Sequence, residues 1–486
     1  MERQNVLLLL VDQWPALSFG HRGASIGTPN TDQLASAGTV FTNAFTSCPL
    51  CSPARGALLT SRWPCQTGVY DNFGIGYSIQ PPLSMDEPTW IDAAVDSGYH
   101  VGYFGKWHLG YDGPIQRGAH RHLKSFDRGF KVYDPETSDY SYERAASAYV
   151  KERERLMSGN PPFWGILDAP KEETAPFRLA GNGQDFLNEY ASGITDEPFF
   201  LTVSINPPHF PHYLPKEYAK LVDLDSVELP PNIEDDFANK PDFHAKPWWP
   251  SMDTSGFDET DWRRMIAFSM LHISLVDEAI GKVLNTLEAN NLDKNTIVVF
   301  TSDHGDMRGA HNRFDKGAYF YEEVWRIPLI VRAPGMPHAE QDAFVSILDV
   351  GETLFRCVQA QDNPDKPRAG RDIMPLVGTS DQPQDWVQEA FGVYDAYNGM
   401  SFAVRAIRTE RYKYIWNLQS VNEFYDLQKD PDEMVNLSTC ANIAPMEQKL
   451  RGRLFDWMES VGDDRSVRVE QLPPAGTILA TNRMGP

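Results

Sequence analysis

The segment from residue 48 to residue 62 places a cysteine at a predicted helix start. It reads Cys-Pro-Leu-Cys-Ser-Pro-Ala-Arg-Gly-Ala-Leu-Leu-Thr-Ser-Arg. Ser52 is a favoured N-cap residue and Pro53 suits the first helical turn, so we expect Cys51 to face backbone N–H groups that can hold an anion. Arg55 adds a fixed positive charge nearby. A free cysteine is often a small buried residue, and on this segment alone that interpretation of Cys51 stays open.

Further polar residues follow four apolar runs, where a parallel sheet would gather them. Ligands of open parallel sheets bind outside the carboxyl ends of the strands, so these residues are candidates for chemistry. Two aspartates, a glutamine and a histidine from two strand ends would make an oxygen-rich site for Ca²⁺, Mg²⁺ or Mn²⁺. The runs are Val6–Val11, Tyr99–Phe104, Phe199–Ile205 and Ile297–Thr301, and they are followed by Asp12 and Gln13, by Lys106 and His108, by His209, and by Asp303 and His304.

The cysteine segment resembles the signature of the type I sulfatases, which is Cys-x-Pro-x-Arg followed by Leu-Thr-x-Arg. The second part is Leu59-Thr60-Ser61-Arg62 in this chain. Four further motifs, in the order of the family, extend the resemblance over most of the chain. They are Gly105–Gly110 (Gly-Lys-Trp-His-Leu-Gly), Pro207–Pro211 (Pro-Pro-His-Phe-Pro), Ser302–Asp306 with His311 and Lys316, and Arg411–Tyr414 with Glu423–Leu427 and Asp430-Pro431.

The resemblance implies that a formylglycine-generating enzyme converts Cys51 to formylglycine. One hydroxyl of the hydrated aldehyde would attack sulfur, and the other would later expel sulfate. The resemblance also implies one divalent metal ion, with Ca²⁺ expected ahead of Mn²⁺ and Mg²⁺, that polarises the hydrate and the sulfuryl oxygens. The implied metal ligands are Asp12, Gln13, Asp303, His304 and the hydrated Cys51.

The remaining family roles fall on charged and polar side chains around that ion. Asp303 would accept the proton of the attacking hydroxyl, and His108 would take a proton from the second hydroxyl as sulfate leaves. Taken singly, such residues also have structural explanations, as hydrogen-bonded histidines, solvated lysines or helix-capping aspartates. The sulfate and the leaving oxygen would be neutralised by Lys106, His209 and Lys316. Arg55 would brace the nucleophile loop, and the substrate would be contacted by Asn72 and His311. We expect three further histidines to be structural or rim residues, namely His21, His212 and His244.

The predicted metal ligands of this chain differ from the commoner set of the family. The commoner set is Asp-Asp near the start of the chain and Asp-Asn in the motif that corresponds to Ser302–Asp306. This chain has Asp12-Gln13 and Asp303-His304. That pairing resembles choline sulfatases and phosphonate monoester hydrolases, which are relatives in the alkaline phosphatase superfamily. The phosphonate hydrolases replace the Lys-x-His segment with Thr and Tyr, whereas Lys106-Trp107-His108 retains both residues. We therefore expect hydrolysis of sulfate monoesters, with phosphonate monoester or phosphodiester hydrolysis as the alternative.

Two other classes of protein fit this sequence less well. Gly23–Gly27 matches the nucleophile elbow of serine esterases around Ser25. An elbow joins a strand directly to a helix, however, and the residues on both sides read as a loop. A non-catalytic binding protein on the same fold would lack the nucleophile or a metal ligand, and none is missing in this sequence.

The composition of the chain limits the kinds of partner that the protein can bind and the cellular compartment in which we expect it. A formal net charge of −23 over 486 residues, with no Lys/Arg run, argues against nucleic acids and anionic membranes as partners. An anionic substrate stays compatible, because a few buried cations and a metal ion can outweigh the surface charge inside a pocket. The sequence begins without the pattern of a signal peptide or a membrane span, and its five cysteines predict no disulfide framework. We therefore expect a soluble, cytoplasmic protein.

Apolar runs alternate with helical segments, as is typical of parallel strands buried on both faces. We expect helices at Asn30–Ala37, Trp90–Ser97 and Arg263–Asn290, and a further strand of this kind at Pro328–Arg332. With the resemblance, this pattern predicts an alkaline-phosphatase-like α/β sandwich over residues 1–378. Residues 379–486 predict a smaller antiparallel-sheet subdomain, with strands at Phe402–Arg408, Tyr412–Trp416 and Glu423–Leu427 and a helix at Met446–Ser460.

The sequence leaves the substrate open. Glu136–Pro250 reads as long loops interrupted by the Phe199 strand, and long loops are often functional. The tryptophans of this stretch and the loop Tyr394–Met400 could line a cleft or pack in the core. Aryl, alkyl, choline and carbohydrate sulfates all remain candidates, and the tail Leu472–Pro486 could be an arm on a second subunit of a homo-oligomer. The tryptophans are Trp164, Trp248 and Trp249.

Overall fold

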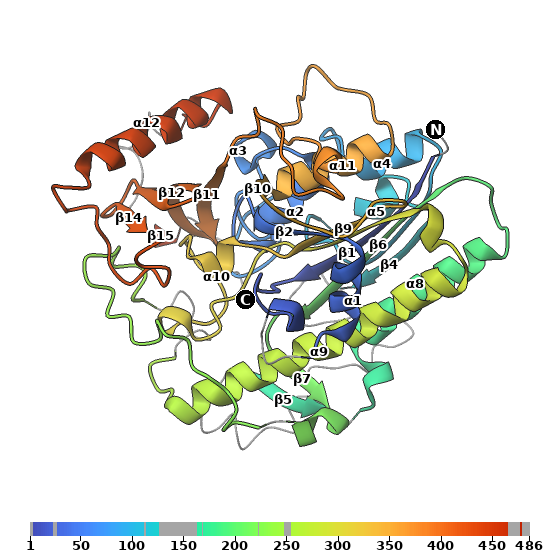
Figure 1. Cartoon of the computed structure of the whole chain (residues 1–486), viewed down its shortest axis with the longest axis horizontal. Helices are drawn as coiled ribbons and strands as arrows, with labels where there is room; N and C mark the ends of the chain where they lie inside the picture. The colour runs from blue at the N-terminus through green and yellow to red at the C-terminus, as the bar shows by residue number, and fades with distance from the viewer. Residues whose placement is uncertain are drawn as a thin grey trace, which may run out of the picture.

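A large mixed sheet forms the centre of the computed structural model, which describes residues 3–22, 27–110, 113–125, 163–167, 169–221, 223–246, 254–464 and 477–478. Within these residues the sheet has eight strands in the order β10-β2-β9-β8-β1-β6-β3-β4 (Figure 1). Neighbouring strands are parallel except where β9 pairs with β2 and β8. The strands are β1 (Asn5–Asp12), β2 (Thr39–Phe45), β3 (His100–Lys106), β4 (Arg121–Ser125), β6 (Phe199–Pro208), β8 (Thr296–Ser302), β9 (Leu329–Arg332) and β10 (Ala339–Ser346).

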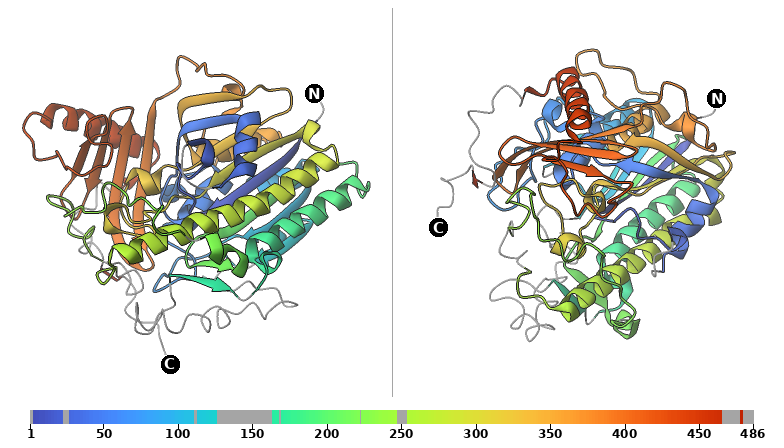
Figure 2. Two further views of the ribbon diagram at one scale, coloured as in Figure 1. Left: turned by 60° about the horizontal axis from the view of Figure 1, so that its bottom comes forward. Right: turned by 60° about the vertical axis from the view of Figure 1, so that its left-hand side comes forward.

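Helices cover both faces of this sheet, which confirms the predicted α/β sandwich (Figures 1 and 2). The side chains of β1 alternate between two core clusters, one on each face, because successive residues of a strand point to opposite sides. Each buried Leu or Val of these clusters stabilises the fold by about 1.5–3 kcal/mol. One face carries α2 (Cys51–Thr60), α4 (Trp90–Asp96) and α11 (Ile347–Cys357), and the other carries α1 (Pro29–Ala37), α8 (Ala175–Ala191) and α9 (Glu259–Ala289).

A second, antiparallel sheet follows in the chain, and α12 (Ala444–Ser460) packs against it. Its strands are β11 (Glu389–Tyr397), β12 (Met400–Thr409), β13 (Tyr412–Asn417) and β14 (Glu423–Asp426), and β15 (Thr477–Ile478) pairs with β12. The predicted subdomain of strands and one helix is thus present. The described residues of the C-terminal tail, Thr477–Ile478, pair with β12 of the same chain, and an arm on a second subunit stays a prediction. The domain division after residue 378 stays a prediction, as does a homo-oligomer.

The remaining short elements connect these layers. A two-stranded sheet joins β5 (Trp164–Leu167) to β7 (His212–Pro215). Among the described residues, the other helices are α3 (Pro64–Thr67), α5 (Gly113–Gln116) and α10 (Glu322–Trp325), and the 3₁₀ turns lie at Gly20–Arg22, Lys171–Glu173, Lys216–Leu221, Asp293–Asn295, Ala310–Asn312 and Met374–Leu376. None of the helices in the described ranges is long and apolar enough to cross a lipid bilayer.

Three expectations about secondary structure were wrong. The stretch predicted as long loops contains the 17-residue helix α8. Its proline lies in the first turn, where no backbone N–H is needed, and its Gly183 lets the helix approach Val203 closely. The strand at Leu329–Arg332 is antiparallel to both neighbours, because a strand buried at the centre of a sheet is apolar in either direction. The predicted loop Tyr394–Met400 is the end of a β-hairpin.

Gly105 shows how closely β3 and β6 approach each other. It has φ +112°, and a Cβ built on it would lie 1.9 Å from the carbonyl oxygen of Ser204, its partner in β6. Only glycine adopts this conformation without strain, and the approach leaves no room for a methyl group.

We expect Gly105→Ala to lower the free energy of unfolding by about 3 kcal/mol or more, because the two strands must part to admit the methyl group. The thermal unfolding midpoint should fall sharply. Gly181→Ala is the control, because Gly181 lies within α8 and a Cβ added there would meet no neighbouring side chain within 4 Å. This change should stabilise the helix by about 0.5–1 kcal/mol. An unfolding midpoint of Gly105→Ala equal to that of the wild type would contradict this account.

Candidate active site

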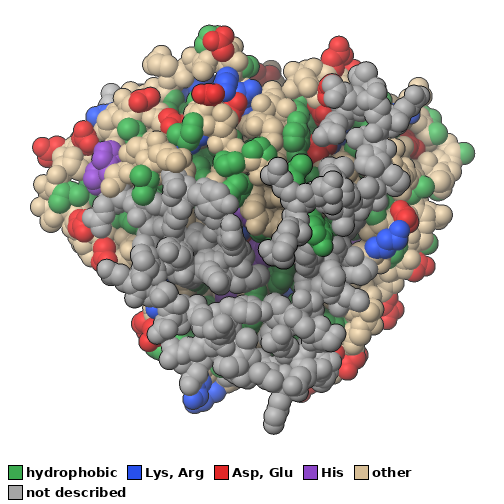
Figure 3. Space-filling model, turned by 180° about the vertical axis from the view of Figure 1, so that it is seen from behind, with side chains coloured by type: hydrophobic (Ala, Val, Ile, Leu, Met, Phe, Trp, Pro, Cys, Tyr) green, Lys and Arg blue, Asp and Glu red, His purple; other side chains and the backbone are tan. Residues whose placement is uncertain are grey.

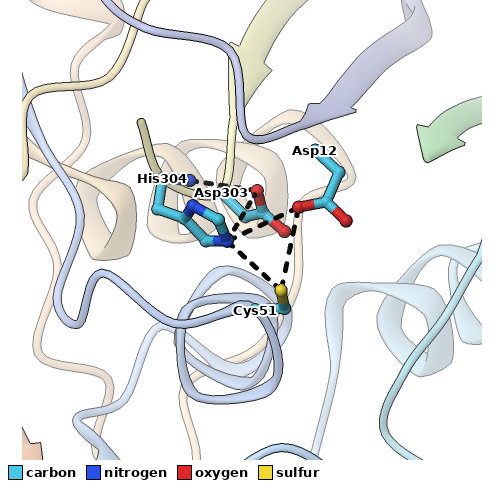
Figure 4. A group of neighbouring side chains, drawn as sticks. All are labelled: Asp12, Cys51, Asp303 and His304. Carbon is cyan, nitrogen blue, oxygen red and sulfur yellow. Dashed lines mark hydrogen bonds and ion pairs between the residues drawn. The ribbon is translucent and has the colours of Figure 1, made fainter. Parts of the chain in front are cut away.

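Four side chains that can ligate a metal meet at the carboxyl ends of β1 and β8 (Figure 4). Asp12 ends β1, Asp303 and His304 follow β8, and Cys51 begins α2. One ligand atom from each lies within 4.8 Å of the others, and all four residues are buried. The parallel register that sets Val11 beside Ser302 brings the two strand ends together. The structure thus gathers four of the predicted metal ligands into one cluster.

The imidazole of His304 points its Nε2 atom into this cluster. Nδ1 lies 2.8 Å from the carbonyl oxygen of Gly305 and therefore carries the hydrogen, whereas Nε2 lies 3.2 Å from Cys51 Sγ and 3.5 Å from Asp12 Oδ1. The contact with Gly305 fixes the ring as metal-ligating histidines require. Burial alone would lower the pKa of His304, but Asp303 and Cys51 raise it to about 9. Metal binding would thus have to displace a proton from Nε2.

Cys51 is the first residue of α2, so the helix begins two positions earlier than the sequence predicted. Leu50 occupies the cap position, and Ser52 does not cap the helix. The Ser52 hydroxyl instead donates to the carbonyl of His108 at 2.6 Å and accepts from the N–H of Phe73 at 3.0 Å. The free N–H of Ser52 donates to Oδ1 of Asn72 at 3.1 Å. An amide from another loop therefore replaces the predicted serine cap.

Arg55 lies one turn into α2 and donates hydrogen bonds to residues of three strands or their ends, which are β8, β3 and β6. Its Nε donates to Asp303 at 2.8 Å, and one terminal nitrogen donates to the carbonyl of Lys106 at 3.0 Å and to the hydroxyl of Ser204 at 2.9 Å. The Lys106 carbonyl also accepts from the hydroxyls of Ser204 and Tyr103 at 2.8 and 2.7 Å. Arg55 therefore braces both the acid Asp303 and the backbone that presents Lys106.

Each cation of the site is paired with a carboxylate. Arg55 pairs with Asp303, Lys106 with Asp12, and Lys316 with Asp315. These six side chains carry no net charge, so a divalent ion held by Asp12, Asp303 and His304 would make the site positive toward an anion. Burial would raise the pKa of Asp12, but Lys106 and other positive groups hold it well below its ordinary value, as a ligand requires. The donor set and its charge therefore fit a divalent cation.

Lys316 uses all three of its N–H donors within the site. Its ammonium lies 2.9 Å from Gln13 Oε1, 2.8 Å from His209 Nε2 and 2.8 Å from Asp315 Oδ1. The second ring nitrogen of His209 contacts the carbonyl of Phe210 at 2.7 Å. The structure thus brings Lys316, His209 and Gln13 together as predicted residues of one site, with Gln13 bound to Lys316. The role of Gln13 as a metal ligand stays a prediction.

The two predicted histidines of the site outside the metal cluster differ in burial: His108 is buried and His209 is partly buried. Burial, with the positive charges of Lys106 and Arg55, holds the pKa of His108 well below its ordinary value. Burial and Lys316 lower the pKa of His209 in the same way. A neutral imidazole can accept a proton, which is what the expected role of His108 needs. On the side of the molecule turned away in Figure 1, histidine side chains are visible near the centre of the face (Figure 3).

The ring of His311 is held by other residues of the protein, and its predicted contact with the substrate stays a prediction. Its Nδ1 lies 2.6 Å from Asp235, its Nε2 lies 3.0 Å from the amide nitrogen of Asn232, and its ring stacks on Tyr321. Both ring nitrogens are therefore engaged by the protein. His212 and His244 are buried as expected. Ser25, Trp248 and Trp249 lie outside the described residues, and Trp164 packs in the core.

The sequence analysis missed three residues that hold the site in place. Ser204, Asp315 and Asp71 contact Arg55, Lys316 and the amide of Asn72 respectively. Asp315 and Asp71 each directly precede a predicted residue, Lys316 and Asn72, in the sequence. An acidic residue at these positions was the signal from which a supporting role could have been predicted. The hydroxyl of Ser204 follows an apolar run and gave no pattern of its own. No disulfide joins Cys48 to Cys51, and all five cysteines are free thiols.

Comparison with known proteins gives a consistent result. The family model described as Sulfatase matches residues 4–360, and the model described as N-sulphoglucosamine sulphohydrolase, C-terminal, matches residues 309–460. The chain is 31% identical over 468 residues to an uncharacterized sulfatase of Escherichia coli, covering 95% of this chain and 88% of that protein. It is 27% identical over 489 residues to an ulvan-active sulfatase of Formosa agariphila, covering 99% and 86%. The fold matches a phosphonate monoester hydrolase of Agrobacterium radiobacter with a TM-score of 0.75, at 24% identity over 94% of this chain and 96% of that one.

We expect calcium to raise the thermal unfolding midpoint of the protein after treatment with a chelator, because an ion that binds the folded state adds about 2.7 kcal/mol at a hundred times its dissociation constant. His304→Ala should abolish this shift by removing one of the four donors. Asp349→Asn is the control, because Asp349 lies on α11 and bonds Arg371, outside the cluster. A calcium shift that survives in His304→Ala, with calcium still bound by elemental analysis, would contradict the site.

Proposed function

This chain belongs to the sulfatase family and is a sulfuric ester hydrolase, and we propose that it hydrolyses sulfate monoesters through a formylglycine made from Cys51. The placement of Cys51 carries the proposal. Its sulfur sits at the N-terminal end of a helix, 3.2 Å from His304 and 3.8 Å from Asp12, inside a group of metal donors. Helix N-termini favour negative charge, so an oxygen at this position can develop charge as it attacks.

The cation would be held by Asp12, Asp303 and His304, with Gln13 and the modified Cys51 completing the shell. Calcium suits the oxygen-rich set, and magnesium or manganese are the alternatives. When bound, such an ion supplies positive charge that polarises the sulfuryl oxygens and the hydroxyls of the hydrated aldehyde. The paired charges of the surrounding residues leave that positive charge uncancelled, so an anion is drawn into a protein whose net charge is −23.

The first step transfers the sulfuryl group from the substrate to the protein. Asp303 takes the proton of one hydroxyl of the aldehyde hydrate as that oxygen bonds sulfur, and the ester oxygen leaves as the alcohol or phenol after taking up a proton. Lys316 lies beside His209. Lys106, His209 and Lys316 together neutralise the sulfate oxygens and the leaving oxygen, and each lysine exchanges a contact inside the site for one to the substrate. Arg55 keeps Asp303 oriented during the transfer.

The second step releases sulfate without attack of water on sulfur. His108 takes the proton of the remaining hydroxyl, the carbon–oxygen double bond re-forms, and the carbon–oxygen bond to sulfate breaks. The lowered pKa of His108 leaves its imidazole neutral and ready for this proton. Water then hydrates the aldehyde and returns the protein to its starting state.

The substrate is proposed to be a small-molecule or carbohydrate sulfate ester. Relatives of this chain include a protein named as an ulvan-active sulfatase, which supports a carbohydrate among the candidates. Aryl, alkyl and choline sulfates stay candidates as well. The protein also needs a formylglycine-generating enzyme as a partner for maturation. A cytoplasmic location, inferred from the sequence, stays a proposal.

Phosphonate monoester or phosphodiester hydrolysis is the second candidate function. It is favoured by the pairs Asp12-Gln13 and Asp303-His304, which this chain shares with phosphonate monoester hydrolases by resemblance. Lys106 and His108 favour sulfate instead, and the structure places Lys106 against Asp12 at the centre of the site. The two functions are separated by substrate preference alone, since both use the same nucleophile.

We expect Cys51→Ala to abolish hydrolysis of para-nitrophenyl sulfate, because the variant lacks the residue that is proposed to become the formylglycine nucleophile. The wild type, co-expressed with a formylglycine-generating enzyme, should show a higher kcat/KM for this ester than for para-nitrophenyl phenylphosphonate. Cys48→Ala is the matched control, since Cys48 is also a buried thiol three residues earlier. Activity that survives in Cys51→Ala would overturn the proposal, and a preference for the phosphonate would select the second function.

We expect His108→Ala to slow release of sulfate more than its transfer, because the hydroxyl that remains has lost its proton acceptor. Intact-protein mass spectrometry during turnover should then show chain that carries one added sulfuryl group, after a burst of phenol. His212→Ala is the control, since His212 is buried beside His272 and is assigned no role in the reaction. Steady turnover in His108→Ala without the added mass would refute this assignment.

A further inference from the structure

The tip of the β11–β12 hairpin reaches from the second sheet to the loop beside the nucleophile. Tyr397 and Met400 pair across a two-residue turn made by Asn398 and Gly399, both with positive φ (50° and 93°). Such a turn presents its backbone N–H groups outward, normally to solvent. In this protein Asn398 is buried, with 8% of its surface exposed. Something other than water must therefore satisfy these N–H groups.

The carboxylate of Asp71 accepts both of them. The N–H of Asn398 donates to Oδ1 at 2.7 Å, and the N–H of Gly399 donates to Oδ2 at 2.7 Å. The N–H of Asn72 also donates to Oδ1 at 2.7 Å, so the same carboxylate orders its own loop. The hydrogen bond from the N–H of Tyr77 to the carbonyl of Asn398, 3.0 Å long, closes the contact from the other side.

This contact continues to the nucleophile through one residue. The side chain of Asn72 accepts the N–H of Ser52 at 3.1 Å, which is the first free N–H of α2 after Cys51. Its amide nitrogen lies 3.5 Å from the side-chain oxygen of Asn398. The position of Asn72 therefore depends on Asp71 at its backbone and on Asn398 at its side chain, and it faces the residue next to Cys51.

The same hairpin tip also reaches the cation side of the site. The hydroxyl of Tyr397 lies 3.4 Å from Oδ2 of Asp315, whose other oxygen holds the ammonium of Lys316 at 2.8 Å. The chain between Tyr397 and Gly399 thus touches supports of both the nucleophile and Lys316. Tyr397 is buried, with 3% of its surface exposed, so this arrangement is part of the packed interior.

We propose that Asp71 is a positioning residue of the sulfatase site, which latches the hairpin tip Tyr397–Gly399 to the nucleophile loop and so fixes Asn72 against the N-terminus of α2. The inference rests on the proposed function for its kinetic consequence. Asp71 does not touch the reacting atoms, and it acts through Asn72 and Ser52 on the orientation of the residue at position 51. Small displacements of a reacting group lower the rate much more than they lower substrate binding.

Asp71→Asn breaks the latch at a defined point. Oδ1 can still accept the N–H groups of Asn72 and Asn398, but the second oxygen is replaced by an NH₂ group that faces the N–H of Gly399. The new NH₂ group and the N–H of Gly399 are then two donors that face each other in a buried place. The hydrogen bond to Gly399 is lost, and the hairpin tip moves away from residue 71. We expect kcat per mole of formylglycine to fall by about ten- to a hundredfold, with KM changed by less than about threefold.

Asp277→Asn is a matched control for the loss of a buried aspartate. Asp277 accepts the backbone N–H groups of Asn30 and Thr31 at 3.0 and 2.8 Å and the side chains of both residues. It joins α9 to α1 and has no role in the proposed reaction. Burial raises the pKa of Asp71 and of Asp277 alike. Both changes should lower the thermal unfolding midpoint, and only Asp71→Asn should lower kcat.

The experiment measures kcat and KM for para-nitrophenyl sulfate, the formylglycine content by peptide mass spectrometry, and hydrogen exchange of the peptide that contains Ser52. Faster exchange of the Ser52 amide and a lower kcat in Asp71→Asn, with neither change in Asp277→Asn, would support the proposal. Equal kcat in Asp71→Asn and wild type, or equal losses in both variants, would overturn it. If the wild type hydrolyses no sulfate ester, the proposed function fails, whereas the exchange of Ser52 still tests the latch.

Discussion

The burial of two carboxylates side by side at the ends of β1 and β8 is the constraint that the rest of the site satisfies. Asp12 and Asp303 are both fully buried, and isolated charges in that position would be strongly unfavourable. Lys106 and Arg55 offset them from neighbouring elements, and the carbonyl of Lys106 is itself held by Arg55. The helix α2, the end of β3 and the group of side chains that could hold a metal ion are therefore parts of one assembly in which each buried charge has a partner of opposite sign.

The order of the strands makes this assembly feasible. β1 lies between β6 and β8, so three parallel strands end at one edge and deliver their polar residues within reach of one another. The start of α2 meets the same edge, and the chain after β8 supplies Lys316. Because helices cover both faces of the sheet, water can reach these residues only from the edge at the carboxyl ends of the strands, where the substrate would bind. The fold thus strengthens the electrostatic interactions on which the proposed chemistry depends.

The sequence predicted the strands that carry the site well, because a run such as Val6–Val11 is apolar at every position and is followed at once by polar residues. It predicted Cys51, Lys106 and His108 from motifs whose spacing is local. It gave no sign of the partners of His311, because nothing along the chain indicates that Asp235 and Asn232 would occupy both ring nitrogens. Contacts between residues far apart in the chain, such as Asp71 with the hairpin turn, leave no periodic pattern and could not be read from composition or spacing.

The burial of Cys51 has a consequence for the order of events during synthesis. Its sulfur is covered by His304, which lies 253 residues later in the chain, and the loop beside it is held by Asn398, 326 residues after Asn72. Only 1% of the surface of Cys51 is exposed in the finished fold. The formylglycine-generating enzyme proposed above would therefore have to reach Cys51 before these later segments fold over it, and slower folding of the C-terminal sheet would lengthen the interval in which the thiol can be modified.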